Sequence, residues 1–76
     1  MRKKVTLVTG AAGEVGTSLV QRLTETSPRT VLTLDLSSLP STLPTGQVHM
    51  QGDILDTSLL SRLVAEYEIE CIFHLA

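Results

Sequence analysis

Residues 5–16 read VTLVTGAAGEVG, an apolar run followed by glycines at every third position, and this stretch decides the fold. The apolar run predicts a buried strand over residues 4–9, and the glycines predict a tight turn into a helix. Such a turn requires backbone angles and close approaches that a Cβ atom would prevent. The amide groups at the start of the helix then converge on one place, which suits an anion. We therefore expect a phosphate-binding unit of strand, turn and helix.

The spacing of Gly10, Gly13 and Gly16 distinguishes this turn from two well-known phosphate loops. The G-x-G-x-x-G fingerprint of dinucleotide-binding proteins needs its first glycine at Ala11 instead. The loop G-x-x-x-x-G-K-[ST] is excluded, because Thr17 rather than a lysine follows the last glycine. A glycine-rich turn also occurs in α/β proteins that bind no nucleotide, so the rest of the chain has to decide.

The composition is that of a globular α/β protein. Of the 76 residues, 42% are hydrophobic and 18% are charged, with a net charge of −2; this argues against a disordered chain and against a basic surface for nucleic acid. No apolar stretch reaches the roughly 18 residues of a membrane span, and no signal core follows the basic residues 2–4. We therefore expect a cytoplasmic protein. The single cysteine, Cys71, offers neither a disulfide nor a metal-binding spacing, so we expect no metal site and expect Cys71 to pack as a small hydrophobe.

Strand and helix patterns alternate along the whole chain. Apolar spacing predicts a helix over 14–26 with Val15, Leu19, Val20 and Leu23 on its inner face. Further strands are expected at 30–35, 48–51 and, buried, at 71–75, with an irregular connection over 36–46 and a turn at 52–56. A second helix is expected from Ser58 to about Tyr67, with Asp56 or Thr57 as its cap. Its apolar face consists of Leu60, Leu63, Val64 and Tyr67.

This order of elements predicts the α/β class and the N-terminal part of a doubly wound parallel sheet, a Rossmann fold with strand order 3-2-1-4. Parallel sheets need helices on both faces, and each βαβ unit takes about 30 residues, so such folds usually exceed 100 residues. We therefore expect residues 1–76 to be the N-terminal portion of a single dinucleotide-binding domain.

Two aspartates follow predicted strands. Asp35 lies 19 residues after Gly16, near the spacing at which a carboxylate meets the adenosine ribose of NAD. It would repel the 2′-phosphate of NADP, and residues 36–39 contain no arginine to hold one, so NAD is favoured; the alternative is an exposed aspartate in a turn. Asp53 follows the third strand and either accepts a hydrogen bond from the adenine amine or serves as a turn residue.

The motifs T-G-x-x-G-x-x-G at 9–16, Asp35, G-D-I at 52–54 and H-L-A at 74–76 occur in one order along the chain. In this combination the chain resembles the extended short-chain dehydrogenases, the NAD-dependent epimerase/dehydratase family. The resemblance implies these cofactor-binding residues: Gly10, Gly13, Glu14, Val15, Gly16, Asp35, Asp53, Ile54, Leu75 and Ala76.

The resemblance also implies a role for most of these residues. The three glycines form the pyrophosphate loop, with Val15 donating a backbone amide, and Asp35 holds the adenosine ribose. Residues 53–54 contact the adenine, and residues 75–76 line the path towards the nicotinamide ribose.

Two departures from the family pattern limit what this chain is expected to do. Glu14 stands where a bulky apolar residue is common, and we expect it to point to solvent. The family's general acid/base is a tyrosine followed four residues later by a lysine, whereas Tyr67 is followed by Cys71. We therefore expect no catalytic residue here. The resemblance implies that His74 is a structural residue or one that acts through a neighbouring residue.

The resemblance implies an intact cytoplasmic, homo-oligomeric NAD-dependent oxidoreductase, epimerase or dehydratase. It would act by reversible hydride transfer on a nucleotide-sugar or a similar substrate. The alternative is a stand-alone, non-catalytic nucleotide-binding or regulatory module, which would have to cover its apolar fourth strand by oligomerisation.

Overall fold

A computed structural model describes residues 2–37 and 47–75. Its elements follow in the order β1 (Lys3–Thr9), α1 (Glu14–Thr26), β2 (Thr30–Asp35), β3 (Gln47–Gln51), α2 (Thr57–Glu66) and β4 (Tyr67–His74). Most of the connection expected over 36–46, from residue 38 on, lies outside the described residues, as does Ala76.

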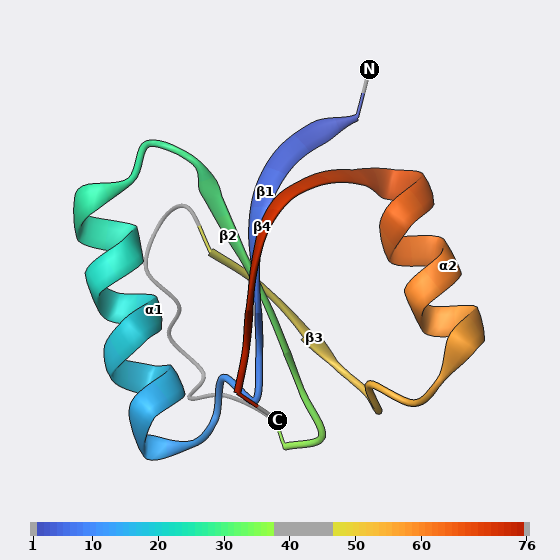
Figure 1. Ribbon diagram of the computed structural model, residues 1–76, viewed down its shortest axis with the longest axis horizontal. Helices are drawn as coiled ribbons and strands as arrows, with labels where there is room; N and C mark the ends of the chain where they lie inside the picture. Colours follow the sequence, from blue (N-terminus) through green and yellow to red (C-terminus); the bar gives the residue numbers. More distant parts are fainter. Residues whose placement is uncertain (1, 38–46, 76) are drawn as a thin grey trace.

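The four strands form one parallel sheet in the order β3-β2-β1-β4, which confirms the expected strand order and the α/β class. Helix α1 covers one face of the sheet and α2 covers the other (Figure 1). This is the arrangement that right-handed crossovers produce when successive helices pass on opposite sides of a parallel sheet.

Two cores result from this layering, one under each helix, because side chains alternate between the faces of a strand. The core under α2 consists of Val5, Leu7, Leu32, Leu34, Leu59 and Leu63. The core under α1 consists of Val8, Ala11, Val20 and Val31. The inner strands β1 and β2 therefore read as nearly continuous apolar runs, as strands buried on both faces do.

The inner faces of the helices differ in part from the prediction. In α1 the buried residues are Gly16 and Val20, and Val15 is 69% exposed. Gly16 lies directly against the turn before the helix, so its neighbour Val15 points outward. In α2 Leu63 is buried as expected, but Val64 is 56% exposed.

The junction between α2 and β4 was predicted wrongly. Helix α2 ends at Glu66, and β4 begins at Tyr67 without a connecting loop. The backbone of Tyr67 is extended, with φ of −124° and ψ of 147°, and its ring packs on the core under α2 from the strand rather than from the helix. Tyr67 and Ile69 alternate with glutamates over 67–70, and this period of two is typical of a strand.

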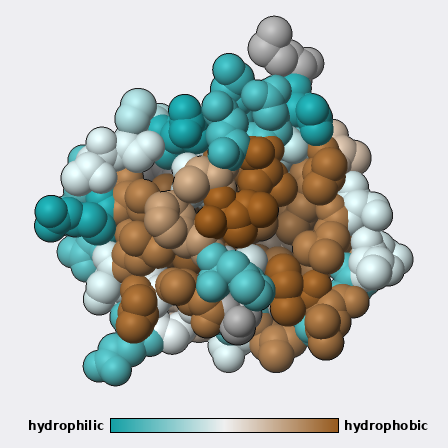
Figure 2. Space-filling view, in the orientation of Figure 1, coloured by the Kyte–Doolittle hydropathy of each residue, from teal (hydrophilic) through white to brown (hydrophobic). Residues whose placement is uncertain are grey.

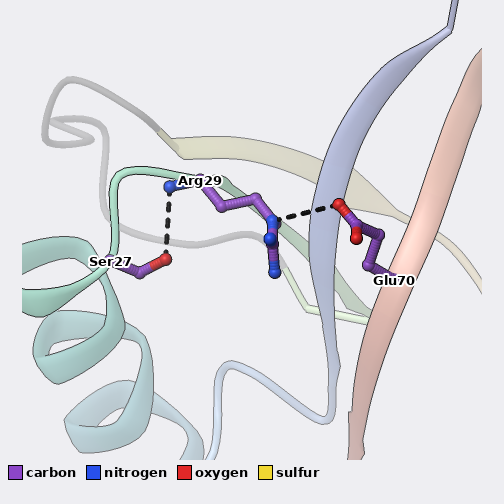
Figure 3. Close-up of polar contacts among 3 residues, drawn as sticks. All are labelled: Ser27, Arg29 and Glu70. Carbon is purple, nitrogen blue, oxygen red and sulfur yellow. Dashed lines mark hydrogen bonds and ion pairs between the residues drawn. The ribbon is translucent and has the colours of Figure 1, made fainter.

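A bulge interrupts the pairing of β4 with β1. Val5 pairs with Ile69 and Thr6 pairs with Cys71, so Glu70 is an extra residue in β4. The Glu70 carboxylate lies 3.3 Å from Nε of Arg29, which directly precedes β2 (Figure 3). The bulge therefore brings β4 into contact with the start of β2 across β1.

Strand β4 is more exposed than expected. Cys71 is exposed, and Ile72 is 57% exposed, because among the described residues β4 has only β1 as a neighbour in the sheet. Apolar side chains gather over the middle of the molecular face on which β4 lies (Figure 2). Within residues 2–37 and 47–75, no helix has the length and apolar character needed to cross a membrane.

Candidate functional site

The carboxyl ends of β1, β2 and β3 meet at one edge of the sheet, where a cavity of about 150 Å³ opens. Its lining combines apolar and acidic groups and consists of Thr9, Gly10, Leu34, Asp35, Leu36, Gly52, Asp53 and Ile54. Several residues that the sequence pattern singled out at separate places are thereby brought together. Crevices outside the carboxyl ends of parallel strands are where α/β sheets bind ligands.

The turn after β1 needs glycine at two positions. Gly10 has a φ of 70°, in the left-handed region, and its amide donates to the carbonyl of Leu34 at 2.9 Å. A Cβ at Gly16 would meet the Gly10 carbonyl oxygen and would lie 2.8 Å from Cα of Ala11. At Gly13 a Cβ would meet only the Gly10 oxygen at 3.5 Å, so the protein itself leaves room there.

The start of α1 has amides available for an anion. Gly13 is the N-cap and supplies no side-chain hydrogen bond, and its carbonyl accepts from the amide of Thr17 at 2.9 Å. The hydrogen bonds among residues 2–37 and 47–75 leave the amides of Glu14, Val15 and Gly16 without an acceptor. The Glu14 side chain is exposed, as expected. These amides and the helix dipole give the turn a positive electrostatic character.

Asp35 connects the glycine turn with the end of β2. Its Oδ2 accepts from the amide of Ala12 at 3.0 Å, and its Oδ1 accepts from the amide of Ser37 at 2.8 Å. The hydrogen bond from Ser37, followed by that from Ala12, lowers the pKa of the Asp35 carboxyl below its ordinary value of 3.8. The group is therefore ionised at neutral pH, and two of its roughly four lone-pair sites are occupied by these amides.

Asp53 is a turn residue that also lies at the cavity. Its Oδ1 accepts from the amide of Leu55 at 2.9 Å, which is the hydrogen bond of a turn-forming aspartate. It also lines the cavity together with Ile54. Asp56 is the helix cap, as expected, and accepts from the amides at the start of α2.

His74 and Leu75 attach β4 to the end of β1. Nδ1 of His74 lies 2.6 Å from Oγ1 of the buried Thr9, and the amide of Leu75 donates to the Thr9 carbonyl at 3.0 Å. The His74 side chain is exposed rather than part of a core, yet its contact is with the strand, which agrees with a structural role. Tyr67 pairs with Lys3, at the end of β1 far from Gly10, so it stands away from the site.

Four further residues shape the site without having been singled out by a sequence pattern. Ala12 and Ser37 contribute through backbone amides, which any residue type supplies, so no sequence signal marks them. Thr17 donates its hydroxyl to the Gly13 carbonyl at 2.8 Å, a bond between residues four apart that a threonine in the first helical turn can form. His49 reaches the turn after Asp35 from β3 through its ring, and the strand alternation on β3 places it on the face of Gln47.

Comparison with known proteins identifies the family. A model of the NAD dependent epimerase/dehydratase family matches residues 6–76, nearly the whole chain. The chain belongs to the NAD-dependent epimerase/dehydratase family. It spans 19–24% of the length of the curated relatives that it matches.

Two relatives illustrate the breadth of this epimerase/dehydratase family. Short-chain dehydrogenase/reductase family 42E member 1 of Macaca fascicularis is 33% identical over 75 residues, which cover 99% of this chain and 19% of the relative. UDP-glucose 4-epimerase of Pasteurella multocida (strain Pm70) is 41% identical over 78 residues, which cover 92% of this chain and 23% of the relative.

Solved structures share the fold of this family member. The dTDP-glucose 4,6-dehydratase from Bacillus anthracis str. Ames superposes with a TM-score of 0.85 at 21% identity, over 96% of this chain and 26% of the dehydratase, and establishes the Rossmann arrangement. MoeE5, solved with UDP-glucose and NAD, superposes with a TM-score of 0.73 at 37% identity, over 93% of this chain and 21% of the MoeE5 chain.

Proposed function

We propose that residues 1–76 form the NAD-binding portion of an NAD-dependent epimerase, dehydratase or related sugar-nucleotide oxidoreductase that works by reversible hydride transfer. One observation carries the proposal. The ionised carboxylate of Asp35 and the open amides at the start of α1 flank the same glycine turn at the carboxyl edge of the sheet. Donors for a diphosphate and an acceptor for ribose hydroxyls therefore lie side by side.

Each part of the adenosine half of NAD has a group that suits it. The diphosphate would take the amides of Glu14, Val15 and Gly16, because helix N-termini bind anions. The ribose hydroxyls would donate to the remaining lone pairs of Asp35. The adenine would enter the cavity lined by residues 52–54, where Leu34 and Ile54 are apolar and Asp53 offers an acceptor.

The chemistry of the intact protein requires more than these residues. Bound NAD supplies the hydride acceptor and donor. Tyr67 lies at the opposite end of β1 and has no lysine four residues later, so the proton acceptor is expected elsewhere in the intact protein. Leu75, beside Thr9, and Ala76 remain candidates for the path towards the nicotinamide ribose.

Sequence similarity to the UDP-glucose 4-epimerase, and to MoeE5 with its bound UDP-glucose, supports a nucleotide-sugar substrate for the intact protein. The proposal includes a homo-oligomeric assembly and a cytoplasmic location, both of which were expected from the sequence.

Calorimetric titration with NAD and NADP tests the proposal. We expect NAD to bind and NADP to bind at least about tenfold more weakly, because its phosphate would meet the Asp35 carboxylate. Asp35→Asn should weaken NAD binding by about tenfold or more, since a hydrogen bond to a charged group contributes roughly 1.5–3 kcal/mol. Glu25→Gln, which removes a carboxylate from the exposed side of α1, is the matched control. Equal affinity of the wild type and Asp35→Asn for NAD would contradict the proposal.

A further inference from the structure

His49 joins the buried part of the sheet to the turn that follows Asp35. It lies on β3 directly opposite Thr33 of β2, and its Nδ1 is 2.7 Å from Oγ1 of Thr33, which is fully buried. Its other ring nitrogen, Nε2, is 3.2 Å from the carbonyl oxygen of Ser37. One ring therefore spans from the interior to the exposed turn.

The chemistry of the partners determines which ring nitrogen carries the proton. The Ser37 carbonyl only accepts, so Nε2 of His49 must be the donor. In the neutral ring Nδ1 then accepts from the Thr33 hydroxyl. If Nδ1 is also protonated, it donates to Thr33 Oγ1, and the Thr33 hydroxyl turns to the carbonyl of Val48 at 3.3 Å. The bond to Ser37 is compatible with both charge states of the ring.

The turn that His49 holds is the one that carries a partner of Asp35. The Ser37 amide donates to Asp35 at 2.8 Å while its carbonyl is held by His49. The preceding carbonyl, that of Leu36, accepts from Nε2 of Gln51 at 3.1 Å. Two side chains of β3 thus fix the two successive carbonyls that follow Asp35. The Ser37 amide in this fixed turn is the main reason that the pKa of the Asp35 carboxyl is lowered.

We propose that His49 is a positioning residue that determines cofactor specificity: it holds Ser37 in place, and with it the Asp35 carboxylate that receives the adenosine ribose. The inference rests on the proposed function. The 2′-phosphate of NADP would add roughly two negative charges beside the Asp35 carboxylate. The site could accommodate this phosphate only if the turn opened and its amides moved away from Asp35. The hydrogen bond from His49 to Ser37 opposes that opening.

Two conservative variants separate the two ends of the ring. A glutamine at position 49 places an amide donor near the Nε2 position and restores the bond to Ser37. An asparagine reaches only the Nδ1 position and keeps the contact with Thr33. We therefore expect His49→Asn to weaken NAD binding by about three- to tenfold, the effect of one lost hydrogen bond. NADP binding should not weaken, because the turn opens more easily without this bond, so the ratio of the NAD affinity to the NADP affinity decreases. The affinities of His49→Gln should stay near those of the wild type.

The experiment measures dissociation constants for NAD and NADP by calorimetry on the wild type, His49→Asn and His49→Gln. An unchanged NAD affinity in His49→Asn overturns the inference, as does a loss in His49→Gln equal to that in His49→Asn. If the wild type binds NAD and both variants bind it with the same affinity, only this inference is overturned. A wild type that does not bind NAD overturns the proposed function as well.

A second measurement needs neither bound cofactor nor a variant that folds. Long-range ¹H–¹⁵N spectra of the wild-type protein distinguish the two neutral tautomers of the His49 ring. We expect the proton on Nε2. A proton on Nδ1 alone would leave Ser37 without its donor and would overturn the inference.

Discussion

Replacing Gly16 by alanine should distort the turn that carries the cofactor site. The new Cβ would meet the Gly10 carbonyl oxygen and would lie 2.8 Å and 3.0 Å from Cα and C of Ala11. All of these are backbone atoms, so no side-chain rotation relieves the contact. Overpacking of this kind costs about 1–3 kcal/mol, and we expect the upper end of that range.

Alanine also has a favourable effect at this position, which has to be subtracted. Gly16 lies within α1, where alanine is better than glycine by about 1 kcal/mol. The net loss in the free energy of unfolding is then about 2 kcal/mol. Urea unfolding followed by circular dichroism would show this as a midpoint lowered by about 1–2 M, for a slope of about 1–2 kcal/mol per molar urea.

Gly13→Ala is the matched control. Its Cβ would be 3.5 Å from the nearest atom, and Gly13 has a φ of −72°, which alanine adopts freely. We expect it to lower the midpoint by clearly less than Gly16→Ala does. It should also weaken NAD binding, because the methyl group would lie in the turn to which we assign the diphosphate. A Gly16→Ala protein as stable as the wild type would refute the steric account of the turn.

Three further outcomes are expected. Because the pKa of Asp35 is lower in the folded state, its contribution to stability is present above about pH 5 and is lost as the pH falls through 3.8 and the lower folded value. In acid, the free energy of unfolding of Asp35→Asn should therefore fall less steeply with pH than that of the wild type. Leu63→Ala should cost about 2–5 kcal/mol in urea unfolding because Leu63 is 1% exposed, whereas its neighbour Val64, 56% exposed, should tolerate alanine within about 0.5 kcal/mol. Arg29→Ala should lower the free energy of unfolding by less than about 1 kcal/mol, since the ion pair of Arg29 with Glu70 is partly exposed. This loss should be smaller still in 1 M salt, which unfolding measured at low and high salt will show.

The first strand, the turn and the first helix could be predicted because their cause is local. The positions of Gly10 and Gly16 are required by a backbone angle and by a close approach within a few residues, and the sequence displays both. The inner strands follow in the same way from their uninterrupted apolar runs. Asp35 was predictable because its distance from the glycines along the chain reflects one helix and one strand.

The errors arose where tertiary contacts override the local pattern. Tyr67 fits a helical spacing from Leu63 as well as it fits a strand, and only its pairing with Lys3 decides between them. Cys71 lies in an apolar run, but its exposure depends on which strands flank β4. The role of His49 depends on the register between β2 and β3, which the sequence of β3 alone does not contain.

The extra residue in β4 reverses the face of the sheet to which the odd-numbered residues after it point. Before Glu70 the odd-numbered Ile69 lies with the core under α2, and after it the odd-numbered Phe73 lies with the core under α1. A deletion of Glu70 would make Ile69 and Cys71 consecutive residues opposite Val5 and Thr6, so Phe73 would keep its core and His74 its place opposite Thr9, while the ion pair with Arg29 would be lost. In an alignment of this strand, a one-residue gap at position 70 therefore marks a regular strand without the bulge, and the columns on both sides of the gap keep their faces. An ungapped relative with an unbroken alternation would instead have these faces exchanged after position 70.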